Sequence, residues 1–309
     1  MNTDVGETDI KIYYSLEKAL LEPENVKILD LHYKDLDTFP EEIFRLTNLE
    51  ELIIWNNQLE YVPEKISKLK KLKKLDLSGN RIITLPASIS ELQDLEILVV
   101  SWNRLTELPE SIGRLTKLNR LGLNNNKIKE LPDSIGNIIS LVELVVSEND
   151  LRNLPDTIGD LSNLEKLRAP GNHLTKLPES LGKLTKLTKL EVHENNITEL
   201  PENIGNLVSL EKARLFKNLL VALPESFCNL NKLQKLLLYE NELKSLPDRI
   251  GALSNLEELE LGFNYLTELP ESIAGLEKLK YISLTSNEFS EESKQNIIAK
   301  LPNTRIDWY

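Results

Sequence analysis

The side chains best suited to acid–base or nucleophilic chemistry are few, since the 309 residues include three histidines and one cysteine. His173 and His193 are close enough in sequence to share a metal ion with Glu194. Two histidines without a third strong ligand are nevertheless a poor zinc signature. Cys228 would need a histidine base within hydrogen-bond reach to act as a nucleophile. Whether these groups can meet depends on the elements that carry them.

A 23-residue period determines where each of these groups lies. It runs from Val26 to about Pro302 without insertion or deletion. Repetition of this kind indicates a solenoid, in which each unit buries its apolar face only against its neighbours. The leucines at one position of the period are Leu49, Leu72, Leu95, Leu118, Leu141, Leu164, Leu187, Leu210, Leu233, Leu256 and Leu279. The asparagines that keep the same step are Asn57, Asn80, Asn103, Asn126, Asn149, Asn172, Asn195, Asn218, Asn241, Asn264 and Asn287.

Each unit reads L-x-x-L-x-L-x-x-N-x-L-x-x-L-P-x-x-I-G-x-L-x-x, which predicts a strand followed by a short helical turn. In the unit that starts at Leu95, Leu98 and Val100 alternate with solvent-facing residues as strand residues do. Asn103 ends the strand, where its amide can both donate to and accept from backbone groups that the strand ladder leaves free. Pro109 can fix the first φ of the turn, and the acidic residue after it suits a helix N-terminus.

This unit is similar to the leucine-rich repeat, and its text LPESIGxLTKL…LxLxxNxLTELP resembles the Ras-group leucine-rich-repeat proteins of plants and animals. It is at least as similar to the multi-repeat proteins of Leptospira and of Bacteroidetes bacteria. Tyr13–Leu31 looks like the N-terminal start of those bacterial proteins, and Ser286–Tyr309 looks like their C-terminal cap. The resemblance implies a curved, non-enzymatic binding protein, in some relatives secreted and directed at host proteins. Many leptospiral relatives are lysine-rich, whereas this chain is acidic.

We therefore expect an α/β solenoid: a right-handed horseshoe of twelve 23-residue leucine-rich repeats, with a parallel concave sheet and short helical or 3₁₀ turns on the convex side. Residues 26–289 would form the repeats, residues 1–25 a helical N-terminal cap, and residues 290–309 a helix-and-strand C-terminal cap, all in one continuous domain. Ser15 and Ser290 are the expected N-caps of the two cap helices. Terminal repeats need such caps because their core would otherwise be open to water.

This fold places the histidines and the cysteine too far apart to act together. His32 lies six repeats from His173, and Cys228 lies on the opposite side of the solenoid from His193. The glycine of I-G-x-L is a repeat position and not part of a phosphate-binding loop. We therefore predict no catalytic residues, no metal site, no cofactor and no enzyme activity.

The solvent-facing columns of the strands are the place where residues that the fold does not require could bind a partner. Eight of the seventeen aromatic residues fall there, and exposed aromatic side chains are common anchors of binding energy. Stacking between neighbouring repeats for stability is the alternative interpretation, because aromatic residues favour strands in any case. The predicted contacts are Tyr33, Trp55, Trp102, His193, Phe216, Tyr239, Phe263 and Tyr281.

A basic column lies on the same face. It consists of Lys166, Lys189, Lys212 and Lys235. Arg168 and Arg214 lie beside it, and we predict both as ligand contacts because guanidinium groups bind carboxylates through two N–H groups. The column could receive an acidic segment of a partner. Neutralisation within the chain, by Glu191 and other carboxylates on neighbouring strands, is the alternative.

Charge and composition restrict the classes of partner and the cellular locations that are expected. A net charge of −12 disfavours nucleic acid and anionic membranes as partners, and no apolar run reaches the ~20 residues of a membrane span. The start of the sequence, MNTDVGETDIK, has neither the basic nor the apolar region of a signal peptide. We expect a cytoplasmic location, or a secreted bacterial protein if a leader has been removed. The single Cys228 allows no intrachain disulfide.

These observations favour a protein-recognition module that holds a protein or peptide partner, including one derived from a host, on its concave face without chemistry. The alternative is a glycan-binding or cell-surface adhesin that uses the same aromatic side chains. The sequence predicts no particular oligomeric state.

Overall fold

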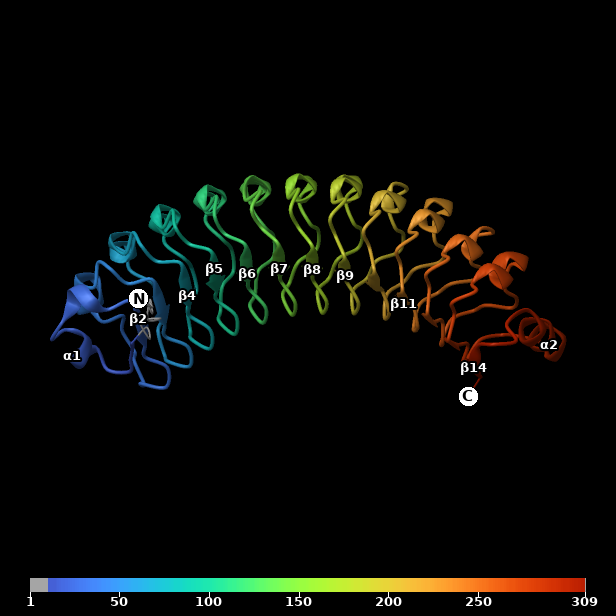
Figure 1. Ribbon diagram of the computed structural model, residues 1–309, viewed down its shortest axis with the longest axis horizontal. Coiled ribbons are helices and arrows are strands. Elements are labelled where there is room, and N and C mark those ends of the chain that lie inside the picture. The colour runs from blue at the N-terminus through green and yellow to red at the C-terminus, as the bar shows by residue number, and fades with distance from the viewer. Residues whose placement is uncertain (1–10, 309) are drawn as a thin grey trace, which may run out of the picture.

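The strands form one parallel sheet in sequence order. The computed structural model describes residues 11–308, and within them the sheet has 14 strands. Figure 1 shows an arch with the helical turns along its outer edge and the strands on the inner side of those turns. The predicted solenoid, with its parallel sheet and short convex turns, is confirmed. The strands are β1 (Ile12–Tyr13), β2 (Ile28–Asp30), β3 (Glu51–Ile53), β4 (Lys74–Asp76), β5 (Ile97–Val99), β6 (Arg120–Gly122), β7 (Glu143–Val145), β8 (Lys166–Arg168), β9 (Lys189–Glu191), β10 (Lys212–Arg214), β11 (Lys235–Leu237), β12 (Glu258–Glu260), β13 (Tyr281–Ser283) and β14 (Arg305–Asp307).

Short 3₁₀ turns connect the strands, and a helix lies near each end of the arch. The helices are α1 (Leu16–Ala19) and α2 (Glu291–Lys300). The turns are η1 (Pro23–Asn25), η2 (Glu41–Arg45), η3 (Glu64–Lys68), η4 (Ala87–Glu91), η5 (Glu110–Arg114), η6 (Asp133–Asn137), η7 (Asp156–Asp160), η8 (Glu179–Lys183), η9 (Ile204–Asn206), η10 (Glu225–Asn229), η11 (Ile250–Ala252) and η12 (Glu271–Gly275). No helix among residues 11–308 is long and apolar enough to cross a membrane.

The core is a stack of identical layers. In β5, Leu98 is fully buried while Ile97 and Val99 on either side are partly exposed. Strand register places Leu98 beside Leu121 of β6, and this pairing of core residues recurs along the sheet. Ile112, from turn η5, is likewise fully buried. Burial of each such side chain contributes about 1.5–3 kcal/mol to stability. The repeated apolar columns therefore account for the fold and for the pairing of equivalent residues on neighbouring strands.

A ladder of asparagine side chains ties each repeat to the one before it. The amide of Asn172 donates to the carbonyl oxygens of Val146, Ala169 and Pro170, and its Oδ1 accepts from the N–H of Leu151. The same pattern recurs at the other ladder positions. In the first repeat, where Lys34 replaces asparagine, the backbone N–H of Lys34 donates to Asn57 Oδ1 at 3.0 Å. The asparagine amides thus donate to and accept from backbone groups at the ends of the strands, as predicted.

The residue before each ladder position has a left-handed backbone. Its φ lies between +50° and +63° in all twelve repeats. Gly79 and Gly171 adopt this conformation without steric cost, but a residue with a Cβ atom pays roughly 1–2 kcal/mol for it. The column nevertheless includes Tyr33, Trp102 and Phe263. The backbone N–H of each of these residues donates to a carbonyl oxygen of the next repeat, at 2.8 Å from Trp102 to Asn124, and these bonds offset the cost of the conformation.

Both caps contain the predicted helices. Ser15 caps α1 by accepting from the N–H of Lys18, and Ser290 caps α2 by accepting from the N–H of Ser293. Trp308 packs edge-to-face on Phe289, with ring centroids 5.7 Å apart, and so covers the last core layer. The predictions for residues 1–10, including the one about a leader, and for residue 309 fall outside the described residues.

Candidate functional site

Three aromatic rings form a continuous stack on the concave face, which we call the C-terminal ring stack (His193, Phe216 and Tyr239). These residues lie two positions after the ends of strands β9, β10 and β11, respectively. The centroids of His193 and Phe216 are 4.2 Å apart, and those of Phe216 and Tyr239 are 4.3 Å apart. The interplanar angles are 21° and 11°. All three side chains are half-buried, so part of each ring remains open to solvent, and Phe216, stacked on both faces, exposes only its edge.

The imidazole of His193 behaves as an apolar member of this stack. Its Nδ1 is buried without a hydrogen-bond partner. Burial lowers the pKa of His193, although Glu194 and Glu191 act in the opposite direction. The ring is therefore neutral at pH 7 and presents a flat, uncharged face to Phe216.

A second cluster lies at the N-terminal end of the sheet. The imidazole of His32 stacks on Trp55 with a centroid distance of 4.9 Å and an interplanar angle of 5°. Tyr33 meets Trp55 edge-on at 4.8 Å. The Nδ1 atom of His32 lies 2.6 Å from Asp30 Oδ1, which fixes the orientation of the ring. These three residues, predicted from the sequence to face solvent together, are brought into contact.

The remaining predicted aromatic residues stand apart from both clusters. Trp102 and Phe263 are 63% and 56% exposed, and neither takes part in a ring contact within the described chain. Tyr281 contacts the C-terminal cap, because its hydroxyl donates to Asp307 Oδ2 and the Arg305 guanidinium lies 5.6 Å from its ring centre. Its contacts favour a structural role.

The two predicted arginines already have carboxylate partners. Arg168 Nη1 lies 3.0 Å from Glu143 Oε1, and its Nε lies 3.3 Å from Glu191 Oε2. Arg214 Nη1 lies 3.3 Å from Glu191 Oε1, and Arg120 Nε lies 3.6 Å from Glu143 Oε2. We call these five residues the Arg–Glu row. Because two carboxylates already pair with the three guanidinium groups, a ligand carboxylate would have to compete with Glu143 and Glu191 for them.

The lysine column is different. Lys166, Lys189 and Lys212 occupy equivalent, directly paired positions on β8, β9 and β10. Within residues 11–308, none of the three has an ion-pair partner within 4 Å, whereas Lys235 pairs with Glu258 at 2.6 Å. Burial lowers the pKa of Lys212, and the charges of Arg214 and Lys235 lower it further, although Glu191 and Glu258 act in the opposite direction. These three lysines therefore carry positive charge without an ion-pair partner among the described residues.

A pair of carboxylates follows on β12. Burial raises the pKa of Glu260, and the hydrogen bond and like charge of Glu258 raise it further. The hydrogen bond from Lys235 instead holds the pKa of Glu258 below its usual value. The concave face thus changes from a cationic region over β8–β10 to an acidic one over β12.

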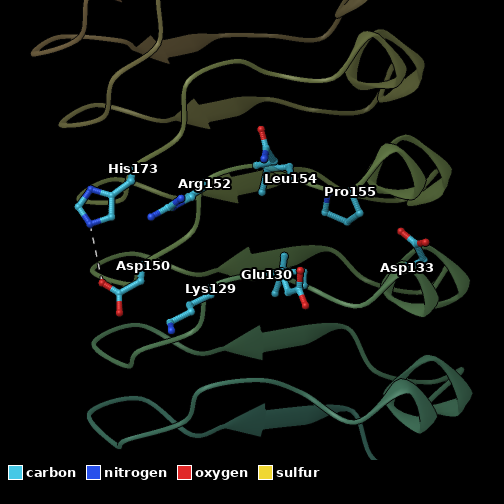
Figure 2. A pocket seen from close by; sticks show the side chains of 10 residues that line it. Lys129, Glu130, Asp133, Asp150, Arg152, Leu154, Pro155 and His173 are labelled. Carbon is cyan, nitrogen blue, oxygen red and sulfur yellow. Dashed lines mark ion pairs between the residues drawn. The ribbon is translucent and has the colours of Figure 1, made fainter.

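Two open cavities lie away from the concave face. They lie on the side formed by the segments that lead from the asparagine ladder back to the turns, which we call the return flank. Figure 2 shows the first, of about 740 Å³, where Lys129 and Arg152 face Asp150 and His173. His173 Nε2 lies 3.8 Å from Asp150 Oδ1. The second, of about 710 Å³, is lined by Lys176 and by carboxylates. Sequence reasoning missed both, because their residues occupy the variable positions of an otherwise ordinary repeat.

The residues suited to chemistry do not assemble. His173 lies on the return flank and His193 on the concave face. In residues 11–308, no three His, Cys, Asp or Glu side chains are grouped so that they could hold a metal ion. Cys228 is buried in turn η10, and burial raises the pKa of its thiol to about 11. It is thus a packed turn residue.

Comparison with protein families agrees with this architecture. A family model described as a leucine-rich repeat region matches residues 65–149, 117–196, 144–219 and 190–305. A second, described as leucine rich repeat, matches residues 24–82. The chain belongs to the leucine-rich-repeat proteins. The predicted resemblance is confirmed, and proteins of this family are generally recognition modules and not enzymes. Comparison with curated proteins gives no match.

Solved leucine-rich-repeat structures resemble most of the chain. A leucine-rich-repeat protein of Leptospira interrogans is 29% identical, covers 96% of this chain and 100% of its own, and has a TM-score of 0.48. The plant peptide hormone receptor RGFR1, solved in complex with RGF2, is 26% identical over 96% of this chain, with a TM-score of 0.68. TLR13, solved in complex with ssRNA13, is 25% identical over 95% of this chain, with a TM-score of 0.79. The chain spans 57% of the RGFR1 structure and 45% of the TLR13 structure.

Proposed function

We propose that this leucine-rich-repeat protein binds a peptide or an extended protein segment on its concave face, and that the C-terminal ring stack is the centre of the site. The stack itself supports this proposal most directly. It places three half-buried rings in contact across three consecutive repeats, with unpaired lysines on two of the same strands, β9 and β10. Partly exposed aromatic clusters of this kind are typical anchors of protein interfaces.

The orientation of the rings favours a peptide over a glycan or an RNA base. Sugars and bases stack on the face of an aromatic ring, but His193 covers one face of Phe216 and Tyr239 covers the other. The exposed ring edges suit the edge-on packing of aliphatic and aromatic side chains. The complex of RGFR1 with RGF2 agrees with a peptide ligand. The RNA complex of TLR13 points elsewhere, but a net charge of −12 opposes RNA binding.

Selection from a random peptide library displayed on phage tests the proposal. The library is selected on the wild-type protein and then tested on a Phe216→Ser/Tyr239→Ser double variant. The matched control is Tyr61→Ser, because Tyr61 is 55% exposed and does not belong to the ring stack. We expect the selected peptides to lose binding to the double variant and to keep it with the control. Equal binding to all three proteins would refute the site.

A glycan array screened with the same three proteins tests the alternative. Binding of a glycan that depends on Phe216 and Tyr239, together with no peptide that does, would replace peptide recognition by the adhesin function.

A further inference from the structure

The charged groups of the concave face form two rows parallel to the ring stack. The lysine column occupies the first residue of each strand, the Arg–Glu row lies mainly on the third, and the ring stack lies on the fifth, two residues after the strand. Residues in a strand rise about 3.3 Å each, so neighbouring rows are about 6.6 Å apart and the outer two about 13 Å apart. Neighbouring strands are about 4.8 Å apart along the rows.

The two outer rows offer a ligand unsatisfied interactions of different kinds. Lys166, Lys189 and Lys212 have no carboxylate within ion-pair distance in the described chain. The rings of Phe216 and Tyr239 are partly open to solvent. The Arg–Glu row between them is already paired. A ligand therefore gains charge pairing on one side, apolar contact on the other, and little in the middle.

We infer that the concave face over β8–β11 takes an extended peptide in which acidic and apolar residues alternate. This inference rests on the proposed function and names the chemistry of its ligand. The peptide backbone lies over the Arg–Glu row, because successive side chains of an extended chain point to opposite sides. Acidic residues then reach the lysine column, and apolar residues reach the ring stack.

The dimensions of the two rows agree with such a segment. The unpaired lysines lie on three neighbouring strands and span about 10 Å. The ring stack spans the same length, but it is shifted toward β11 by one strand, which is about 4.8 Å. In an extended peptide the side chains of one side recur every 6.6 Å or so, and the two sides are offset by about 3.3 Å. Four residues in the order acidic, apolar, acidic, apolar therefore cover both rows, with an acidic residue nearest β8.

Charge distribution supports the acidic component. Over β8–β10 and the residues after them, the concave face carries Lys166, Arg168, Lys189, Lys212, Arg214 and Lys217 against Glu191 and Glu194. This local excess of cations lies on a protein whose net charge is −12. An acidic partner is thus repelled by most of the surface and attracted to this region, which gives orientation and selectivity.

Isothermal titration calorimetry of the wild-type protein with three synthetic peptides tests the inference. The first is Glu-Leu-Glu-Phe-Glu-Leu-Glu, which alternates in both chain directions. The second has the same composition in blocks, Glu-Glu-Leu-Phe-Leu-Glu-Glu, and the third replaces each glutamate of the first by lysine. We expect a dissociation constant for the alternating peptide at least about tenfold below that of the block peptide, which corresponds to 1.4 kcal/mol, and no binding of the lysine peptide. Binding of the alternating peptide should weaken as salt is raised.

Two variants locate the binding. Lys189→Glu should weaken the alternating peptide at least about tenfold, since it puts like charge at the centre of the column. Lys68→Glu, an equal change of charge on convex turn η3, should leave it unchanged. If Lys189→Glu is unfolded by circular dichroism, Lys189→Ser replaces it. Equal binding of the alternating and block peptides would overturn the inference, and so would a dissociation constant of the alternating peptide above about 1 mM. Hepta-glutamate or a heparin oligosaccharide that binds as tightly as the alternating peptide would overturn it as well. Peptides from the phage selection that depend on Phe216 but lack the alternation would overturn it too, and would leave the proposed function intact.

Discussion

The asparagine ladder gives the most direct quantitative test of the fold. Asn172 is 4% exposed and lies between the sixth and seventh repeats. Its side chain has two N–H protons, shared among the carbonyl oxygens of Val146, Ala169 and Pro170 at 3.0, 3.2 and 3.2 Å. Its Oδ1 accepts one further hydrogen bond, from Leu151 at 3.0 Å. Asn172→Ala therefore removes about three full hydrogen bonds, and at about 1 kcal/mol each we expect a loss of about 3 kcal/mol.

Urea denaturation, followed by circular dichroism, measures the loss. Because long repeat arrays depart from two-state unfolding, hydrogen exchange of the Leu151 amide provides a local measurement. The variant leaves this buried N–H without its acceptor, so its exchange should accelerate far more than that of amides in distant repeats. The matched control is Asn163→Ala, whose hydrogen bonds to Ile139 and Lys186 are exposed. It should cost about 1 kcal/mol or less. Equal losses for the two variants, or an unchanged Leu151 amide, would refute the reasoning.

Four further predictions concern single residues. Trp102→Gly should leave the urea midpoint unchanged or raise it, because glycine relieves a φ of +57° at an exposed position; a clear drop in the midpoint would contradict this. The pKa of His193 is lower in the folded protein than in the unfolded chain. As pH drops below about 6.5, the unfolded chain is therefore protonated at His193 before the folded protein, and the free energy of unfolding should fall. His193→Phe should reduce that slope in urea titrations between pH 8 and pH 5. The pKa of Glu260 is raised, so folding penalises its carboxylate, and Glu260→Gln should increase stability at pH 7 but not at pH 4; equal urea midpoints at pH 7 would contradict this. Cys228, with a buried thiol whose pKa is about 11, should react with a thiol reagent at pH 8 only after denaturant is added.

Much of the architecture could be predicted because one set of physical constraints recurs in every repeat. The leucine, asparagine and proline columns fix the strand, the ladder and the turn, and the 3₁₀ segments follow the prolines as expected. The C-terminal helix begins after Ser290, as the sequence predicts, and it ends at Lys300. The N-terminal helix also starts after Ser15 but has only one turn, Leu16–Ala19.

The arrangement of the candidate site was less predictable, since the period determines which face a residue occupies but not its rotamer or partner. It placed Phe216, Tyr239 and Phe263 on one face without showing that two of them stack and the third stands apart. It placed Arg168 and Arg214 beside carboxylates without showing that Glu191 joins them. The contact assignments of the predicted site residues stay predictions until binding is measured.

The left-handed column was a missed signal. Gly79, Gly171, Asn56 and Asn125 all fall in it, and these are the residue types that adopt positive φ most readily. Their shared position, one residue before the ladder, was sufficient to predict the conformation of the whole column.

The unbroken period also has a genetic consequence. Every junction between repeats uses the same leucine, asparagine and proline positions, so recombination that removes or duplicates 23 codons within the array joins two compatible surfaces. The gene can therefore change the length of the arch in whole units while the ladder and core remain continuous. Solvent-facing residues of the lost or gained unit change at the same step, so a single recombination event can alter the reach of the concave face and the chemistry displayed on it.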